Sequence, residues 1–272
     1  MDFGLSQEQQ MLRDAVARCL ADTCPLEHVR ECSERDHPVS DKVLDALQGL
    51  GIPGMMIPEE HGGLGMTLLD AALVAEQLAY AVAPVSFLAS HVLAPLALSE
   101  AGSEDQKVRW LPKIASGEAH ISVAISETVE ARDGAGVTCR GGKLDGTALF
   151  ALDFAGADAF LVADTTGRLH LVPANASGLE KIPLMTIDRT RSVGELRFAQ
   201  VTAEPLADDS GFTAGRLRDA GRILLAADSL GAGQAMIEKA VDYSGQREQF
   251  GRLIGSFQAV KHMCAEMAAH HE

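Results

Sequence analysis

The sequence predicts an α+β protein in three parts: an N-terminal helical bundle, a small central antiparallel β-barrel, and a C-terminal helical bundle of which two helices are present. Apolar residues recur at helical spacing up to residue 118 and again from residue 212. Between these regions the hydrophobic period changes to two, with β-branched residues and frequent glycines. We therefore place the domain boundaries at residues 1–118, 119–208 and 209–272.

The helices of the N-terminal part carry clear start signals. Capping boxes, in which a hydroxyl and a side chain three residues later satisfy early N–H groups, follow from Ser6, Thr67 and Ser103. Ser40 precedes a further amphipathic helix, and Pro95 interrupts an apolar helix expected over residues 86–100. These signals predict a bundle in which the helix after Thr67 is central, because it is apolar around most of its circumference.

The central part contains short runs with strand character separated by turn residues. They cover residues 120–126, 137–140, 148–152, 159–164, 168–174 and 193–201. Six or more short strands in this length favour a compact antiparallel barrel or sandwich. A helical period then runs over residues 212–243, and a second helix begins near Phe257.

Composition excludes several classes of function. The 272 residues are 47% hydrophobic and carry a net charge of −15, so neither a nucleic-acid partner nor a membrane partner is expected. There is no apolar run long enough to span a membrane and no signal-peptide pattern, so the cytoplasm is the expected location. Five scattered cysteines predict free thiols, with neither a disulfide framework nor a zinc site.

Three segments, in order along the chain, resemble one family. They are "PEEHGGLG" from Pro58, "GSEDQKVRWLPKIASGE" from Gly102 and "REQFGRLIGSFQAVKHMCAEM" from Arg247. Together they resemble the acyl-CoA dehydrogenases, flavoenzymes with a helical domain, a β-barrel and a four-helix bundle. The resemblance covers the whole chain and implies FAD as the cofactor and an acyl-CoA thioester as the substrate.

The last of these segments implies a cofactor site. In the family, the residues that match Arg247 and Gln258 contact the FAD of a neighbouring subunit, and Phe250 adds an apolar surface beside them. A guanidinium suits a pyrophosphate and an amide suits ribose or adenine edges. The alternative is that Arg247 caps a helix end and Gln258 is a solvated helix start.

The flavin-ring motifs depart from the family pattern. In "ISETVEARD", Ile125 and Ser126 keep a flavin contact implied by the resemblance, although a serine at a strand end is also a common turn residue. The family's proline, glycine and serine are replaced by Thr128, Ala131 and Arg132.

A second ring motif and the catalytic base also differ. Phe150 stands at the family's tryptophan and Leu152 at the threonine that bonds the flavin N5, and leucine cannot form that bond. One family position for the base glutamate falls on Gly221, and the other lies beyond Glu272. Asp219 and Asp228 are nearby but are expected to be helix-surface or capping carboxylates, so the catalytic residue stays unknown.

These observations leave several hypotheses. The chain is an FAD-dependent acyl-CoA dehydrogenase subunit in a homo- or hetero-oligomer, acting in lipid or sterol side-chain catabolism. Alternatively it is a non-catalytic partner that completes the cofactor site of another dehydrogenase chain, or a flavin monooxygenase or oxidase relative. Two helices of a four-helix bundle leave an apolar face uncovered, which predicts either more chain or a partner. A metal site from His262, Cys264, His270 and His271 is less favoured than a polar helix end.

Overall fold

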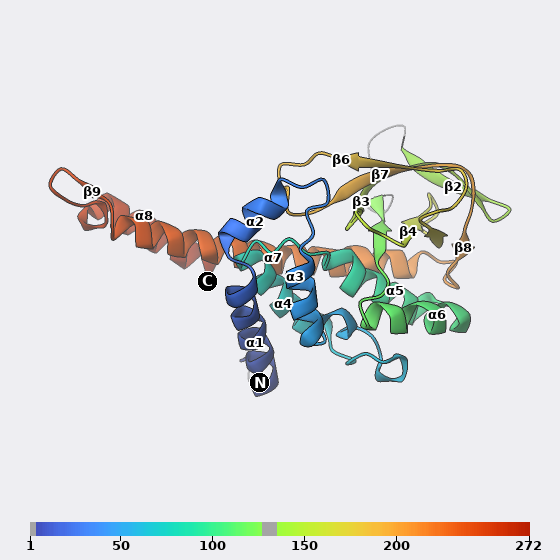
Figure 1. The fold of residues 1–272 in the computed structure, drawn as a ribbon, viewed down its shortest axis with the longest axis horizontal. Coiled ribbons are helices and arrows are strands. Elements are labelled where there is room, and N and C mark those ends of the chain that lie inside the picture. Colours follow the sequence, from blue (N-terminus) through green and yellow to red (C-terminus); the bar gives the residue numbers. More distant parts are fainter. Residues whose placement is uncertain (1–3, 127–134) are drawn as a thin grey trace.

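The computed structural model describes residues 4–126 and 135–272 as a helical body, a central sheet and a long terminal helical arm (Figure 1). The helices are α1 (Gln7–Thr23), α2 (Leu26–Ser33), α3 (Asp41–Gly49), α4 (Leu68–Tyr80), α5 (Ala94–Ala101), α6 (Glu104–Ala115), α7 (Phe212–Ser244) and α8 (Gln258–His271). The strands are β1 (Ile121–Ala124), β2 (Gly136–Arg140), β3 (Lys143–Leu152), β4 (Ala159–Ala163), β5 (Leu169–Pro173), β6 (Leu179–Leu184), β7 (Val193–Thr202), β8 (Glu204–Pro205), β9 (Glu248–Gln249) and β10 (Arg252–Leu253). This arrangement confirms the predicted succession of a helical part, a β part and a helical part.

The predicted capping boxes are present at the starts of α1, α4 and α6. In α1, the N–H of Gln9 donates to the Ser6 hydroxyl over 3.1 Å while the Gln9 amide oxygen accepts from the Ser6 N–H. The apolar helix expected over residues 86–100 is divided into a π-helical segment, Leu88–Leu93, and α5, with Pro95 in the first turn of α5. Proline is tolerated there because the first N–H groups of a helix have no intrahelical partner.

The sheet has the strand order β6-β7-β3-β1-β4-β5-β8, with β2 paired to β3. Its pairs are antiparallel except for β1 and β4, which run parallel with Ile121 opposite Ala159. The predicted antiparallel barrel is therefore corrected to a mixed sheet, and among the described strands the path from β6 to β8 is open. The parallel pair is possible because the β2–β3 hairpin lies within the connection between β1 and β4, which gives it the length that a crossover needs.

Helix α7 joins the three parts of the molecule. Its first two thirds pack against α4, α5 and the π-helical segment, with Leu217 and Leu224 fully buried. Beyond Glu238, which accepts a hydrogen bond from Tyr80 of α4, it leaves the body, and α8 folds back along it to form the arm seen on the left of Figure 1. No residue of α8 is buried.

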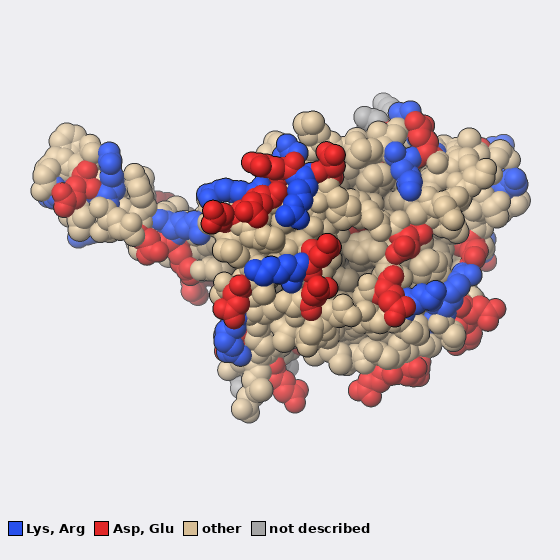
Figure 2. All heavy atoms as spheres, in the orientation of Figure 1, with Lys and Arg blue, Asp and Glu red and all other residues tan. Residues whose placement is uncertain are grey.

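Figure 2 shows that lysines and arginines lie among acidic side chains on this face of the molecule rather than in a basic patch. The net charge of the whole chain is −15. Within residues 4–126 and 135–272, none of the helices has the length and apolar character needed to cross a membrane. The five cysteines are all free thiols, as predicted.

Candidate functional site

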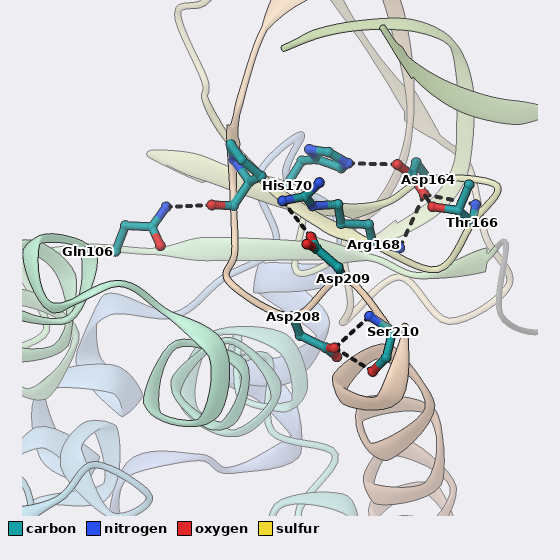
Figure 3. A network of polar contacts seen from close by, with 9 residues as sticks. Gln106, Asp164, Thr166, Arg168, His170, Asp208, Asp209 and Ser210 are labelled. Carbon is teal, nitrogen blue, oxygen red and sulfur yellow. Dashed lines mark hydrogen bonds and ion pairs between the residues drawn. The ribbon is translucent and has the colours of Figure 1, made fainter. Parts of the chain in front are cut away.

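A polar network fixes the first turn of α7 against the sheet (Figure 3). Before the helix, the Asp208 carboxylate accepts hydrogen bonds from the N–H groups of Ser210, over 2.8 Å, and Thr213, over 2.7 Å. The hydrogen bond from the Ser210 hydroxyl, together with these two, holds the pKa of Asp208 well below its usual range. The carboxylate therefore stays charged at the helix N-terminus, where the helix dipole favours a negative charge.

The same network reaches the β4–β5 turn and α6. Arg168 pairs with Asp209 over 2.6 Å, and the Gln106 amide donates to the Pro205 carbonyl over 3.3 Å. In the same network the buried His170 lies 2.8 Å from Asp164. Burial acts to raise the pKa of Asp164, but the hydrogen bonds from Thr166 and His170 outweigh it and lower that pKa. The start of α7 is thus anchored by paired polar groups.

A cavity of about 110 Å³ lies between α4, the residues leading into the π-helical segment, the ends of β3 and β7, and α7. Its walls are mostly apolar, and Leu152 from the sheet and Leu225 from α7 are both among its lining residues. Asp153, Arg191, Ser192 and Asp228 make up its polar lining. The cavity therefore adjoins Leu152, the residue expected at the family's N5-bonding position.

Asp153 links the sheet to the π-helical segment. Its Oδ2 accepts hydrogen bonds from the N–H of Ala89, over 2.8 Å, and the N–H of Ser90, over 3.3 Å. Burial raises the pKa of this carboxyl to about 6, against the lowering effect of those two N–H groups and of Arg191. The π-helical turn exposes the N–H groups that bind this carboxylate, and such turns are frequent at functional sites.

Asp228 differs from its expected role as a surface or capping carboxylate. It accepts a hydrogen bond from the guanidinium of Arg191, which comes from the loop before β7 and also lies 3.6 Å from Asp188. This pair joins α7 to the sheet and lines the cavity. Asp219 fits the expectation, because it is exposed and pairs with Arg218 and Arg222.

The position of the expected base has no carboxylate. Gly221 is buried in α7, and a Cβ built on it would meet only the Leu93 side chain, at 4.0 Å. Proton abstraction next to a thioester carbonyl requires a base within hydrogen-bond reach. Gly221 has no side chain that could act as this base.

The residues expected at the flavin ring come together where β1 and β3 pair. Ser126 is buried and its hydroxyl accepts from the N–H of Leu149 over 3.3 Å, while the half-buried Ile125 packs against the core. Thr128, Ala131 and Arg132 lie outside the described residues. Phe150 has a positive φ of 56° and lies where the β3–β7 register shifts, with more than half of its surface exposed.

The residues expected at the other end of the cofactor lie at the tip of the arm. Arg247 precedes the hairpin of β9 and β10, and its carbonyl accepts from the N–H of Ile254 over 2.8 Å. Phe250 and Gly251 form the two-residue turn, both with positive φ, and the Phe250 side chain is 92% exposed. The Phe250 ring meets Phe257 edge to face, and Gln258 opens α8 next to it.

The arm points away from the sheet, so the two groups of expected cofactor residues are far apart in one chain (Figure 1). Arg247 and Gln258 are exposed, and neither side chain has an ion pair or hydrogen bond within the described part of the chain. A positive φ at a non-glycine residue such as Phe250 is strained, which is common at binding positions. The hairpin is thus preformed and free to contact something outside the chain.

The metal alternative receives no support. Among residues 4–126 and 135–272, no group of three or more histidine, cysteine or acidic side chains is arranged to hold a metal ion. The exposed His270 instead lies 3.8 Å from Glu266, one turn earlier in α8.

The cavity's polar residues were not identified from the sequence. Asp228 was expected at the surface because helical spacing shows which residues share a face but not what packs against that face. The sequence held one signal. Asp228 lies seven residues after Gly221 and four residues after Leu224, which places the three on the same side of α7.

Comparison with protein-family models matches residues 6–118 to "Acyl-CoA dehydrogenase, N-terminal domain" and residues 213–272 to "Acyl-CoA dehydrogenase, C-terminal domain". Acyl-CoA dehydrogenase IpdE2 of Mycobacterium tuberculosis is 33% identical, with 96% of this chain and 71% of that protein covered. Acyl-CoA dehydrogenase FadE27 of the same organism is 32% identical, with 98% of this chain and 72% of that protein covered.

Two solved structures share the fold. The Tcur3481-Tcur3483 steroid ACAD G363A variant superposes with a TM-score of 0.88 at 28% identity, covering 97% of this chain and 74% of that one. The ChsE4-ChsE5 complex from Mycobacterium tuberculosis gives a TM-score of 0.87 at 29% identity, covering 98% and 74%. Similarity in sequence along nearly the whole chain, and in fold with both complexes, leads to one assignment: the chain belongs to the acyl-CoA dehydrogenase family.

Proposed function

We propose that this chain is one subunit of a heteromeric, FAD-dependent acyl-CoA dehydrogenase, in which it binds the phosphate and adenine end of a cofactor whose ring lies mainly in its partner. The observation that carries the proposal is the placement of Arg247, Phe250 and Gln258 on an exposed hairpin far from the chain's own ring-contact residues. Two of the similar solved structures are named as pairs of chains, which supports a heteromer.

The two ends of the cofactor fit this chain differently. At the arm, a free guanidinium, an exposed aromatic ring and a primary amide offer charge-assisted, apolar and hydrogen-bonding contacts suited to a dinucleotide. At the β1–β3 end, the Ser126 hydroxyl accepts from the Leu149 N–H and keeps its own proton, but Leu152 has no hydrogen-bonding atom. The N5 contact therefore does not fit this chain, and the ring contacts fall to the partner.

When bound, FAD supplies the acceptor for the hydride that leaves the acyl chain. In this chain, Arg247 holds the diphosphate and fixes the position of the cofactor, while Phe250 shields its apolar surface. Gly221 provides no base, so the carboxylate that takes the α-proton comes from another part of the assembly. The substrate is an acyl-CoA of lipid or sterol origin, in keeping with the steroid enzyme named among the similar structures.

The proposal is tested by the flavin absorption spectrum of this chain, purified alone and after co-expression with a second acyl-CoA dehydrogenase chain encoded near it. We expect bound flavin and dehydrogenase turnover only in the co-purified pair. Stoichiometric FAD and turnover in the lone chain would contradict the split site.

Arg247→Gln is expected to weaken FAD binding by the pair about 10- to 100-fold, because hydrogen bonds to charged groups are worth about 1.5–3 kcal/mol. The matched control is Lys239→Gln, which removes an exposed positive charge from α7 outside the hairpin. Titration of the apo pair with FAD, followed by flavin fluorescence, measures both. Equal affinities of the two variants would remove Arg247 from the cofactor site.

A further inference from the structure

The hairpin at the tip of the arm contains a second arginine, to which the proposed function gives no role. The guanidinium carbon of Arg252, on β10, lies over the Phe257 ring at 4.0 Å from its centroid. A cation within about 6 Å of a ring centroid is attracted by the negative face of the ring. The Phe257 ring in turn meets Phe250 edge to face, with centroids 6.2 Å apart and planes at 85°. Arg252, Phe257 and Phe250 therefore form one series of contacts, the hairpin cluster.

No carboxylate competes for the Arg252 guanidinium in the part of the chain that the structure describes. Across residues 4–126 and 135–272 this side chain forms no ion pair and no hydrogen bond. Arg109, which lies 5.8 Å from the centroid of the Trp110 ring, differs because its guanidinium is also paired with Glu204. The Phe257 ring is thus the one described partner of the Arg252 side chain, and it lies closer than Trp110 does to Arg109.

Phe257 lies at the joint between the hairpin and α8. Its N–H donates to the Ile254 carbonyl over 3.1 Å, and its carbonyl accepts from the N–H of Lys261 over 3.1 Å. It is the N-cap residue of α8, but a phenylalanine side chain cannot accept a hydrogen bond from the first N–H groups. Because no side-chain cap fixes this helix end, the contacts of the Phe257 ring take over that task. Gln258 follows directly and shares the resulting position.

The hairpin has little else to hold its shape. Its strands β9 and β10 have two residues each, and an isolated two-stranded hairpin is marginally stable in water. Phe250 has a positive φ of 53°, and its side chain is 92% exposed. Such a conformation persists only where the surroundings fix it. The contact with Phe257 is the ring contact that the structure gives Phe250.

We propose that Arg252 is a positioning residue of this hairpin: it holds the Phe257 ring, and through that ring it fixes Phe250 and the start of α8 at Gln258. The inference rests on the proposed function for the ligand that these two residues meet, whereas the hairpin cluster itself belongs to the lone chain.

The cluster is tested in the full chain alone, without flavin or partner, by NMR of labelled phenylalanine rings. Arg252→Gln removes the cation and is expected to shift the ring signals of Phe257 and of Phe250. Lys239→Gln, which removes an exposed positive charge from α7 outside the hairpin, is the matched control and is expected to leave both rings unchanged. If the Phe250 signals stayed in place in Arg252→Gln, the proposal would be overturned, whatever the flavin experiment shows.

The role in cofactor binding is tested in the co-purified pair by titration with FAD. Arg252→Gln is expected to weaken FAD binding about two- to fivefold, the range for a cation–π contact at an exposed site, and so less than Arg247→Gln does. In a chain that already carries Phe257→Leu, the same substitution is expected to have no further effect, because residues that act through one contact are coupled.

An equal loss with and without the Phe257 ring would overturn the proposal, because Arg252 would then act on the cofactor directly. A pair that binds no FAD would contradict the proposed function alone. The ring signals of the lone chain would still decide whether Arg252 positions Phe250.

Discussion

Gly231→Ala is expected to lower the free energy of unfolding by about 3 kcal/mol, because α7 and α4 touch backbone to backbone at this residue. A Cβ on Gly231 would lie 1.9 Å from the carbonyl oxygen of Glu76 and 2.7 Å from its carbonyl carbon. No side-chain rotation relieves such contacts, so the helices must separate. Nearby, the Tyr80 hydroxyl donates to Glu238 and would be displaced with them.

Gly215→Ala is the matched control, since it makes the same change within the same helix. Nothing lies within 4 Å of a Cβ at Gly215. Alanine favours a helix interior by about 1 kcal/mol over glycine, so this variant is expected to be slightly more stable than the original chain. Urea unfolding of both variants measures the difference. If both substitutions shifted the midpoint alike, the α4–α7 contact would not be as tight as described.

The second large effect is a loss of stability in mild acid caused by two buried imidazoles. Burial lowers the pKa of His91 to about 3, with a smaller contribution from His120. Burial also lowers the pKa of His120 to about 4. The charge of Asp158 acts to raise this pKa, and His37 acts to lower it. Both ring nitrogens of His91, and Nε2 of His120, lack a hydrogen-bond partner among the described residues. A proton on either ring would thus be a poorly compensated buried charge.

The sign of the pH dependence follows from these directions. The unfolded chain takes up protons on histidine below about pH 6.5, whereas the folded chain resists protonation until about pH 3–4. The contribution of the two neutral histidines to the free energy of unfolding is therefore complete above about pH 6.5. It is lost as the pH falls below that value. At about pH 5 each imidazole accounts for a loss of about 2 kcal/mol.

Replacing both histidines with glutamine should remove this slope. Urea unfolding at about pH 7 and pH 5 is expected to show that the double variant loses about 4 kcal/mol less than the original chain across this interval. The single variant His91→Gln separates the two contributions. A pH dependence identical in all three proteins would show that these rings are hydrated or paired in solution.

Local signals predicted the helices better than the sheet. The capping boxes at Ser6, Thr67 and Ser103 formed as expected because they depend on residues within one turn. Helix α2 was missed because it is short and its N-cap, Pro25, makes no side-chain cap. Strand β6 was missed because its alternation is weak and it contains Pro183, which suits an edge strand.

Longer-range features could not be derived from spacing. A period of two residues identifies a strand but not its direction, so the parallel pairing of β1 with β4 was not foreseen. Spacing likewise gave no sign that Arg191 pairs with Asp228, because the two residues are 37 positions apart in the sequence. The arm residues were identified only through family resemblance, because their side chains contact nothing within the described chain that a pattern could reveal.

The continuity of α7 has a mechanical consequence. Its 33 residues contain no proline, so it forms a rod of about 50 Å at 1.5 Å per residue, clamped to the body at one end and carrying the hairpin at the other. The stretch from Gly231 to the helix end is about 20 Å long, and a tilt of about 10° there would move the hairpin by about 4 Å. A small change in packing at the α4 contact is therefore converted into a large displacement of Arg247, so the fit to a partner depends on a contact far from it.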